Sequence, residues 1–151
     1  MMDEVKRSLP IDIAVCAAAV SDFKPINKSK NKIKRKNKNL SKISLEKNAD
    51  ILEFLSKNNK ARPGIVVGFS AETENVIQNS KLKIKEKYCD LIIANDVSKK
   101  DIGFNSDFNK VSLIDKNGKI KDIPRNKKSF IASTIAKIIL DKLLMNDKNI
   151  N

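Results

Sequence analysis

The chain has 151 residues and a formal net charge of +13, from 31 Lys and Arg against 18 Asp and Glu. This length suits one domain with a real hydrophobic core, and the charge favours anionic partners such as nucleic acid, a membrane surface or phosphorylated metabolites. His is absent, which excludes histidine acid–base catalysis, Ser-His or Cys-His nucleophile pairs and most zinc sites.

The first third of the chain predicts a helix, two strands and a second helix. Residues 2–9 are typical of a short helix that ends at Pro10. The apolar run 11–18 predicts a buried strand, which we expect to pair in parallel. A basic loop follows, residues 40–46 predict an exposed strand, and residues 49–59 predict a helix with one apolar face.

The rest of the chain continues the alternation. Residues 64–70 and 90–97 predict buried strands on either side of a Lys-rich helix at 72–88. The Asn-Gly pair at 117–118 is typical of a β-hairpin, and residues 126–144 predict a long helix. The pattern indicates an α/β, Rossmann-like three-layer fold, with a largely parallel sheet and a C-terminal β-hairpin plus helix. We expect a single domain over residues 1–151.

The cysteines and the apolar runs bear on the compartment. Cys16 and Cys89 are single cysteines inside apolar strand-like runs, so we expect both to be reduced core residues of a cytoplasmic protein. No apolar run approaches the length of a membrane span, and the N-terminus lacks the layout of a signal peptide. We therefore expect no membrane partner.

Polar residues follow each of the three predicted parallel strands. Asp22, Glu72, Asn95 and Asp96 come where these strands end, the edge at which open α/β sheets bind ligands. Taken singly, the acids among them are more often helix caps or turn formers. Their gathering at one predicted edge favours a binding site. The four glycines form no phosphate-binding glycine motif, so a bound nucleotide would need other contacts.

Lysines supply the positive charge. Seven of the eleven residues from Lys28 to Lys38 are basic, which fits a nucleic-acid arm, a solvated loop or a site for small anions. Only four of the 31 basic residues are Arg, the residue that usually reads nucleic acid, so the charge is weak support for that partner. Lys83 and Lys87 are four residues apart and share a helix face, either as a solvated face or as an anion site.

The ordered motifs resemble those of bacterial phosphopantothenate–cysteine ligases over about residues 4–144. The matching segments are AAAVSDFKP, KIKR, LEKNADIL, VVGFSAET, KIKEKYCDLIIANDV, GFNSDFNKV and KKSFIASTIAKIILDKL. The family joins 4′-phosphopantothenate to cysteine with CTP and Mg²⁺ through an acyl-cytidylate intermediate. The resemblance therefore implies a ligase of coenzyme A biosynthesis with small-molecule substrates and no nucleic-acid partner.

The resemblance also implies roles for individual residues. Lys32 would be the catalytic lysine on a mobile basic flap over residues 26–39. A possible metal contact is Asp22. The residues that would contact CTP are Asp22, Lys32, Asn48, Ala49, Asp50, Ile51, Phe69, Lys83 and Lys87. Ala49 departs from the family pattern, which usually has Pro at this position.

The resemblance begins only after the family's first strand and glycine-rich segment. We therefore expect a truncated or split chain with an exposed apolar sheet edge, and either a homodimer or a pairing with a separate N-terminal polypeptide. Three alternatives stay open. The chain is a ligase, alone or with a partner; it is an inactive CTP-binding remnant; or, least favoured, it is a basic nucleic-acid-binding protein, although its lysine run contains no stacking aromatic residue.

Overall fold

The computed structural model describes residues 1–27, 29, 31, 42–57, 60–98 and 106–148. These residues fall into two compact units. The larger unit comprises Met1–Ala17 and Ile51–Asn151, and the smaller unit comprises Ala18–Asp50. A single domain over residues 1–151 stays a prediction.

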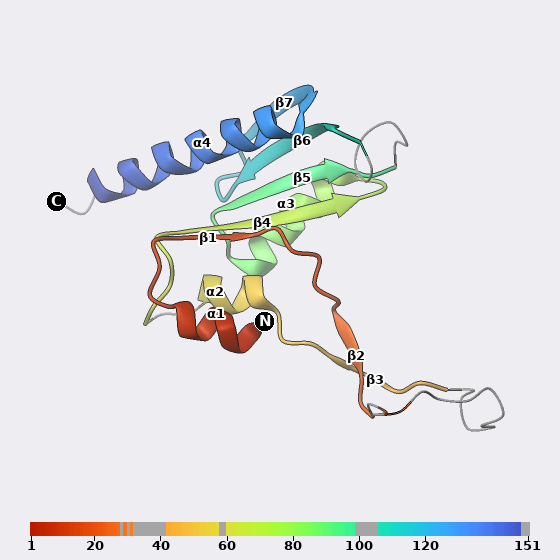
Figure 1. The fold of residues 1–151 in the computed structure, drawn as a ribbon. Coiled ribbons are helices and arrows are strands. Elements are labelled where there is room, and N and C mark those ends of the chain that lie inside the picture. The colour runs from red at the N-terminus through yellow and green to blue at the C-terminus, as the bar shows by residue number, and fades with distance from the viewer. Residues whose placement is uncertain (28, 30, 32–41, 58–59, 99–105, 149–151) are drawn as a thin grey trace. The chain divides into compact units, whose positions relative to one another are not determined.

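The larger unit has three layers, a sheet between two layers of helices (Figure 1). Its helices are α1 (Met2–Ser8), α2 (Ile51–Lys57), α3 (Val76–Lys87) and α4 (Lys128–Lys148), and its strands are β1 (Ile13–Cys16), β4 (Ile65–Glu72), β5 (Leu91–Asp96), β6 (Phe108–Asp115) and β7 (Ile120–Lys127). The strand order is β1-β4-β5-β6-β7, and of these strands only β6 runs against the others. This arrangement confirms the predicted fold class.

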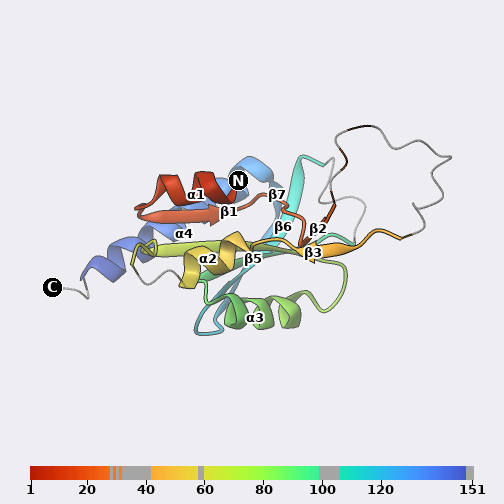
Figure 2. The same cartoon turned by 90° about the horizontal axis from the view of Figure 1, so that it is seen from below.

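Two apolar clusters hold the layers together, one on each face of the sheet. Successive side chains of a strand point to opposite faces, so a strand covered on both faces is apolar at every position. Val67 and Ile93 face α4, whereas Val66 and Ile92 face α2 and α3. The continuous apolar runs of β4 and β5 follow from this double burial. Figure 2 shows the layer of α1, α2 and α3 from below.

Gly68 sets how closely α2 approaches β4. A Cβ atom at this position would lie 2.6 Å from Cδ2 of Leu52 and 2.9 Å from Cδ1 of Ile92. Such distances are well inside van der Waals contact, so a side chain here would force the ends of the Leu52 and Ile92 side chains to shift. The absence of a side chain at Gly68 thus lets Leu52 pack directly on the strand.

β1 forms one edge of the described sheet, and the prediction of a buried strand at 11–18 is wrong in this respect. Only Ala14 of its four residues is buried, and Val15 is 49 % exposed. An apolar run does not indicate whether a second neighbour lies beside it, because edge and central strands pair through the same backbone groups. The exposed apolar edge that the resemblance implies is present at Val15.

The C-terminal hairpin and helix match the expectation closely. β6 and β7 pair in antiparallel register, and the turn between them contains Gly118 at φ 81°, a conformation that glycine adopts without strain. α4 then packs on the sheet through its apolar face, which is formed by Ile131, Ile135 and Ile139. Among the helices that the structure describes, none combines the length and apolar character needed to cross a membrane.

The smaller unit contains a two-stranded antiparallel sheet. β2 (Phe23–Pro25) pairs with β3 (Leu45–Lys47), and an ion pair of 3.3 Å joins Lys24 to Glu46 across the strands. β3 is fully exposed, as the sequence predicted for residues 40–46, although the strand lies further along the chain. Of the predicted flap over residues 26–39, the structure describes residues 26, 27, 29 and 31. Lys32 lies outside the described residues.

Candidate functional site

β4 and β5 both end at one edge of the sheet, which we call the carboxyl edge. Ligands of open α/β sheets bind at this edge. The register pairs Ala71 with Asn95 and Glu72 with Asp96, so the three polar residues that the sequence places after these strands do lie together. Asp22 belongs to the smaller unit, and its position relative to this edge is not determined.

Lys83 and Lys87 turn toward protein acceptors. Nζ of Lys83 donates a hydrogen bond to the backbone carbonyl of Phe69 at 2.9 Å, and Nζ of Lys87 lies 3.4 Å from Oε2 of Glu53. Helical side chains lean toward the N-terminus of their helix, and here α3 begins at the carboxyl edge. The predicted shared face is confirmed, and a purely solvated face is wrong for these two lysines because both are half-buried.

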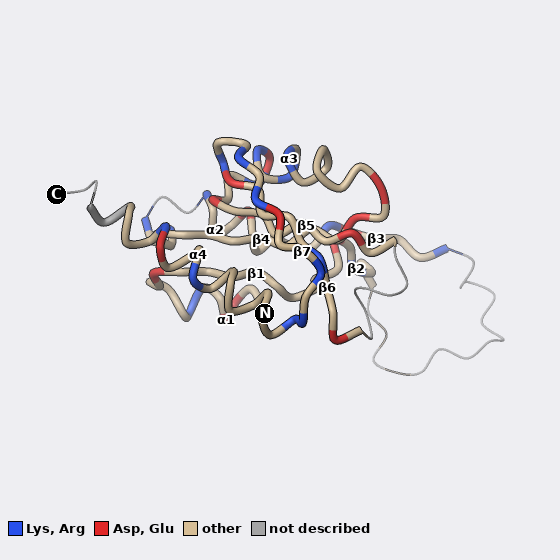
Figure 3. The backbone as a smooth tube through the Cα atoms, turned by 90° about the horizontal axis from the view of Figure 1, so that it is seen from above, with Lys and Arg blue, Asp and Glu red and all other residues tan. Residues whose placement is uncertain are grey.

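The surroundings of these lysines are strongly basic. α3 also carries Lys81 and Lys85 on its exposed side, and within its bounds Glu86 is the single acidic residue. Figure 3 shows this run of Lys along the helix. These lysines make the electrostatic potential along α3 more positive, which attracts anions. The two half-buried ammonium groups, of Lys83 and Lys87, are held in place by protein acceptors.

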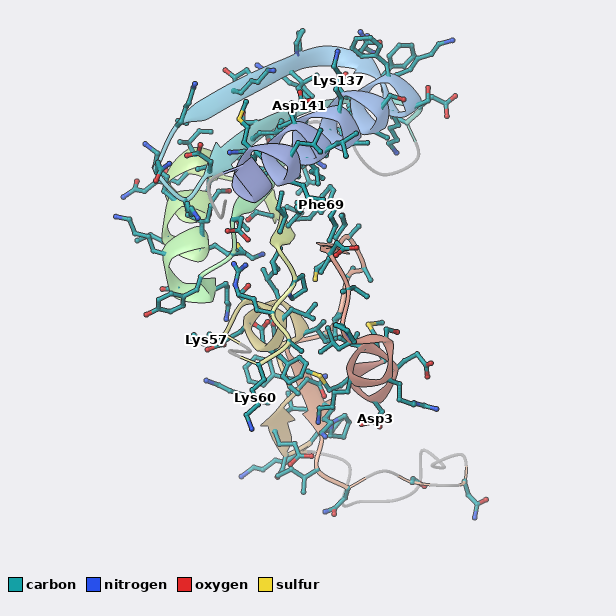
Figure 4. The ribbon with its side chains drawn as sticks, turned by 90° about the vertical axis from the view of Figure 1, so that its left-hand side faces the viewer. Asp3, Lys57, Lys60, Phe69, Lys137 and Asp141 are labelled. Atoms are coloured by element: carbon teal, nitrogen blue, oxygen red, sulfur yellow. The ribbon has the colours of Figure 1, made fainter. Side chains whose placement is uncertain are left out.

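Phe69 contributes two groups to the site. Its side chain, labelled in Figure 4, lies on the α4 side of β4 and packs against the apolar cluster there. Its carbonyl oxygen receives the hydrogen bond from Lys83. The ring therefore faces the α4 side of the sheet, whereas Lys83 reaches the carbonyl of the same residue from α3, which packs on the opposite side.

Glu72 is held by hydrogen bonds at both carboxylate oxygens. The buried hydroxyl of Ser70 donates to Oε1 at 2.6 Å, and Nδ2 of Asn79 on α3 lies 3.1 Å from Oε2. Glu72 thus ties the end of β4 to α3, which neither the capping interpretation nor the ligand interpretation predicted.

The last two residues of β5 behave differently from each other. The Asp96 carboxylate accepts hydrogen bonds from the backbone and the hydroxyl of Ser98, so it forms a turn, as the alternative interpretation expected. Oδ1 of Asn95 is buried and has no hydrogen-bond partner in the described part of the chain. Among the described residues this oxygen is an acceptor without a donor.

The remaining predicted contacts to CTP lie mainly in the smaller unit. The backbone amide of Asn48 donates to the carbonyl of Asp22 at 2.8 Å, and its side chain donates to the carbonyl of Ser21. These bonds bring the segment 48–50 next to Asp22 although the two are far apart in sequence. Ile51 begins α2 in the larger unit and packs against its core.

No preformed metal centre is present among the residues that the structure describes, because no three Cys, Asp or Glu side chains come together there. Mg²⁺ usually binds through one or two carboxylates, with waters and substrate phosphates as its other ligands. A single exposed carboxylate such as Asp22 is compatible with that mode of binding.

The opposite edge of the sheet, where β4 and β5 begin, holds residues that the sequence did not single out. We call it the amino edge. Arg62 donates hydrogen bonds to the carbonyls of Ser56 and Pro63 and to Oδ2 of Asp90, the last at 2.7 Å. The same Oδ2 accepts the backbone N–H of Val66 at 2.9 Å. This cluster joins the end of α2 to the starts of both central strands.

A cavity of about 460 Å³ also lies at the amino edge, lined by Arg62, Ile84, Lys85, Tyr88, Cys89, Asp90 and Lys116. None of the residues predicted to contact CTP lines it. Burial raises the pKa of the Cys89 thiol to about 11, so this cysteine is protonated and unreactive at neutral pH. Cys89 is buried as predicted, whereas Cys16 is only half-buried.

Comparison with known proteins adds a family and a fold. Residues 1–143 match the family described as the DNA/pantothenate metabolism flavoprotein C-terminal domain. A curated relative, the coenzyme A biosynthesis bifunctional protein CoaBC of Borreliella burgdorferi, is 41 % identical over 143 residues, which are 91 % of this chain and 35 % of that protein. A cysteine/cysteine sulfinic acid decarboxylase from an unknown prokaryotic organism is 36 % identical, over 85 % of this chain and 35 % of that protein.

The solved C-terminal domain of a coenzyme A biosynthesis bifunctional protein CoaBC has a similar fold. The TM-score is 0.70 at 27 % sequence identity, and the match covers 97 % of this chain and 61 % of the solved chain. The chain thus spans about a third of the length of the curated relatives it matches.

Proposed function

Because the chain belongs to the DNA/pantothenate metabolism flavoprotein C-terminal domain family, whose curated relatives include bifunctional enzymes of coenzyme A biosynthesis, we propose that it carries the CTP-dependent ligase reaction of that pathway. The reaction joins the carboxylate of 4′-phosphopantothenate to the amine of cysteine. An inactive remnant that binds CTP is the alternative, and the activity experiment below separates the two.

The proposed chemistry has two steps. A carboxylate oxygen of phosphopantothenate attacks the α-phosphorus of CTP, and pyrophosphate leaves with the electrons of the broken P–O bond. The cysteine amine then attacks the carbonyl carbon of the acyl-cytidylate, loses a proton, and CMP departs. The first step brings two anions together, so fixed positive charge must neutralise the phosphate oxygens and the leaving pyrophosphate.

The observation that supports this proposal most is the pair of half-buried ammonium groups on α3. Lys83 is fixed by a hydrogen bond to the backbone carbonyl of Phe69 in β4, the strand whose carboxyl end lies at the edge where α/β sheets bind ligands. Lys87 follows one helical turn later. A triphosphate along this face of α3 would meet preorganised cations without any histidine, and the resemblance assigns Phe69 to the same nucleotide.

The other proposed contacts come from the resemblance. We assign Lys32 to the closing flap, as the group that stabilises charge in the first step, and Asp22 with residues 48–51 to CTP. Mg²⁺ would arrive with the triphosphate and contribute charge neutralisation, with Asp22 as its candidate protein ligand. Exclusion of water by a closed flap would protect the mixed anhydride from hydrolysis.

The reacting cysteine is a free substrate in this proposal. A high pKa of about 11 and burial make the Cys89 thiol a structural group, and the ligase reaction uses the amine of cysteine in place of a protein thiol.

We further propose that the site is completed by more polypeptide than this chain supplies, either a second copy or a separate N-terminal segment. The observation that supports this is the apolar edge that β1 presents, with Val15 exposed. A size measurement on the purified chain, with and without co-expressed N-terminal segment of a relative, distinguishes the two partners.

A pyrophosphate-release assay tests the function directly. Purified chain is incubated with phosphopantothenate, cysteine, CTP and Mg²⁺, alone and with the N-terminal segment of a relative. We expect release that requires phosphopantothenate and prefers CTP to ATP. If neither preparation releases pyrophosphate although CTP raises the melting temperature, the inactive CTP-binding alternative is supported.

Substitution of the flap lysine tests its assigned role. We expect Lys32→Gln to abolish pyrophosphate release while largely sparing the CTP-dependent rise in melting temperature. Lys32→Arg keeps the charge and serves as the control. Equal turnover in the Gln variant would refute the role of Lys32.

A further inference from the structure

Glu53 lies between two lysines in the larger unit. Its Oε1 is 2.6 Å from Nζ of Lys57, one turn later on α2, and its Oε2 is 3.4 Å from Nζ of Lys87 on α3. One carboxylate is therefore shared by a cation of its own helix and a cation of the neighbouring helix.

The two phosphate-binding candidates on α3 consequently differ in their charge. Lys83 donates to a neutral carbonyl and keeps its full positive field, whereas Lys87 faces a carboxylate that offsets its charge. Lys87 is also the less hydrated partner, with 26 % of its side chain exposed against 38 % for Glu53. A phosphate that approaches Lys87 would meet the Glu53 carboxylate at short range, and like charges repel.

We propose that Glu53 is a built-in counter-anion that masks Lys87 in the nucleotide-free protein and, when a nucleoside triphosphate binds, gives up Lys87 while it keeps its contact to Lys57. The proposal rests on the proposed function, in which Lys87 contacts the phosphates. It makes Glu53 a residue that lowers nucleotide affinity, so that release of the nucleotide is favoured.

The arrangement leaves the carboxylate with a cation in both states. When a phosphate takes over Lys87, Glu53 keeps its shorter contact to Lys57 and is not left without a cation. Lys57 is held in place by the ring of Tyr88, 4.8 Å from its Nζ. The hydrogen bond from Lys57, with smaller contributions from the charges of Lys57 and Lys87, lowers the pKa of Glu53, which keeps the carboxylate charged at neutral pH.

Two substitutions with opposite expected effects test the proposal. CTP affinity is measured by calorimetry on the full chain at constant ionic strength. Glu53→Gln removes the counter-anion, and we expect CTP to bind about 2- to 5-fold more tightly, the scale of one partly exposed ion pair. Lys57→Gln removes the alternative cation, so Glu53 stays on Lys87 and CTP binds more weakly.

Glu4→Gln is the matched control. Glu4 is also an exposed helical glutamate in an ion pair, 2.8 Å from Arg7, and the substitution changes the net charge by the same amount. We expect the CTP affinity of this variant to equal that of the wild type, whereas a general effect of net charge would move Glu4→Gln and Glu53→Gln together.

The outcomes separate the proposal from the function on which it rests. If the wild type does not bind CTP, the proposed function fails and the role of Glu53 fails with it. If the wild type binds CTP but Glu53→Gln binds equally or more weakly, Glu53 is not a counter-anion, while the nucleotide site stands. A merely structural Glu53 would lower the melting temperature of both variants without moving their affinities in opposite directions.

Discussion

At the amino edge of the sheet, Arg62 and Asp90 use their polar atoms on one another and on the backbone; at the carboxyl edge, Asn95 keeps a buried oxygen without a described partner. Both edges bound the same two central strands and both contain charged residues. The difference concerns particular groups: Arg62 and Asp90 are satisfied by the protein, although Oγ of the neighbouring Ser56 is also buried without a described partner, and at the carboxyl edge it is an amide oxygen beside the strand ends that lacks one. Satisfied groups stabilise the fold, and groups with remaining hydrogen-bonding capacity are available to a ligand.

The cavity at the amino edge is lined by none of the residues predicted to contact CTP. The space of about 460 Å³ lies at the amino edge, where Asp90 is already bound by Arg62 and approached by Lys116 at 3.6 Å. The positions that the resemblance assigns to CTP in the larger unit lie elsewhere. The following four experiments test whether the two edges differ in this way, and they are ordered from the largest expected effect to the smallest.

Asp90→Asn should be the most destabilising of these changes. Arg62 and the backbone of Val66 both donate to Oδ2, so an amide keeps these bonds only with its NH2 group turned toward Lys116, and in either orientation the negative charge beside Arg62 is lost. We expect a loss of about 2–3 kcal/mol in the free energy of unfolding by urea denaturation. Asp122→Asn, an exposed position, is the control with an expected change of about 0.5 kcal/mol or less. Equal losses would mean that the amino edge has no special role in stability.

The reactivity of the Cys89 thiol tests whether the amino edge opens in the folded protein. Since its pKa is raised from 9.0 to about 11, the reactive thiolate at mildly alkaline pH is about 100-fold rarer than for an ordinary thiol. We expect maleimide to label Cys89 only at the rate of unfolding, as mass spectrometry of digests would show. Rapid labelling in the folded chain would reveal local opening at this edge.

Lys83→Met should lower CTP affinity strongly and stability only slightly, whereas Asp90→Asn should mainly lower stability. The lost bond goes to a single carbonyl at a half-exposed position, so we expect a stability change below about 1 kcal/mol. CTP affinity should fall at least about tenfold if a phosphate contact is lost. Lys85→Met on the same helix is the control that keeps affinity unchanged. A large loss of stability with unchanged affinity would assign Lys83 to the fold alone.

The smallest expected effect is the change with pH in the stability that Glu53 contributes. Its pKa lies below the ordinary value of 4.5 in the folded protein, mainly because of Lys57, so its contribution to stability is complete above that value and is lost as the pH falls through the folded pKa. The difference in unfolding free energy between wild type and Glu53→Gln should therefore shrink on acidification. A difference that grows in acid would contradict the direction of this shift.

The sequence predicted the parts of the fold that depend on local pattern. The apolar runs of β4 and β5 and the Asn-Gly pair at 117–118 required no knowledge of distant residues. The burial of β1 was mispredicted because apolarity does not indicate how many neighbours a strand has. The short strand β2 was missed because its three residues carry no periodic pattern, and its pairing with β3 spans the basic segment.

The sequence likewise predicted the local features of the candidate site but not its contacts between elements. The spacing of Lys83 and Lys87 was enough to place both on one face, but their acceptors were not predictable, because Phe69 and Glu53 come from other elements. The contact of Glu53 with Lys57 could have been found, since the two are four residues apart on a helix. Its contact with Lys87 depends on the packing of α2 against α3 and had no local signal.

The parallel pairing of Ile13 with Ile65 has a consequence for how the chain can change over evolutionary time. The connection between these strands contains the whole smaller unit, and the entropy of closing a loop grows only with the logarithm of its length, about 0.6 kcal/mol for each doubling. Insertions and deletions between β1 and α2 therefore cost the sheet little. Selection can change the length and charge of this connection while the sheet keeps its register.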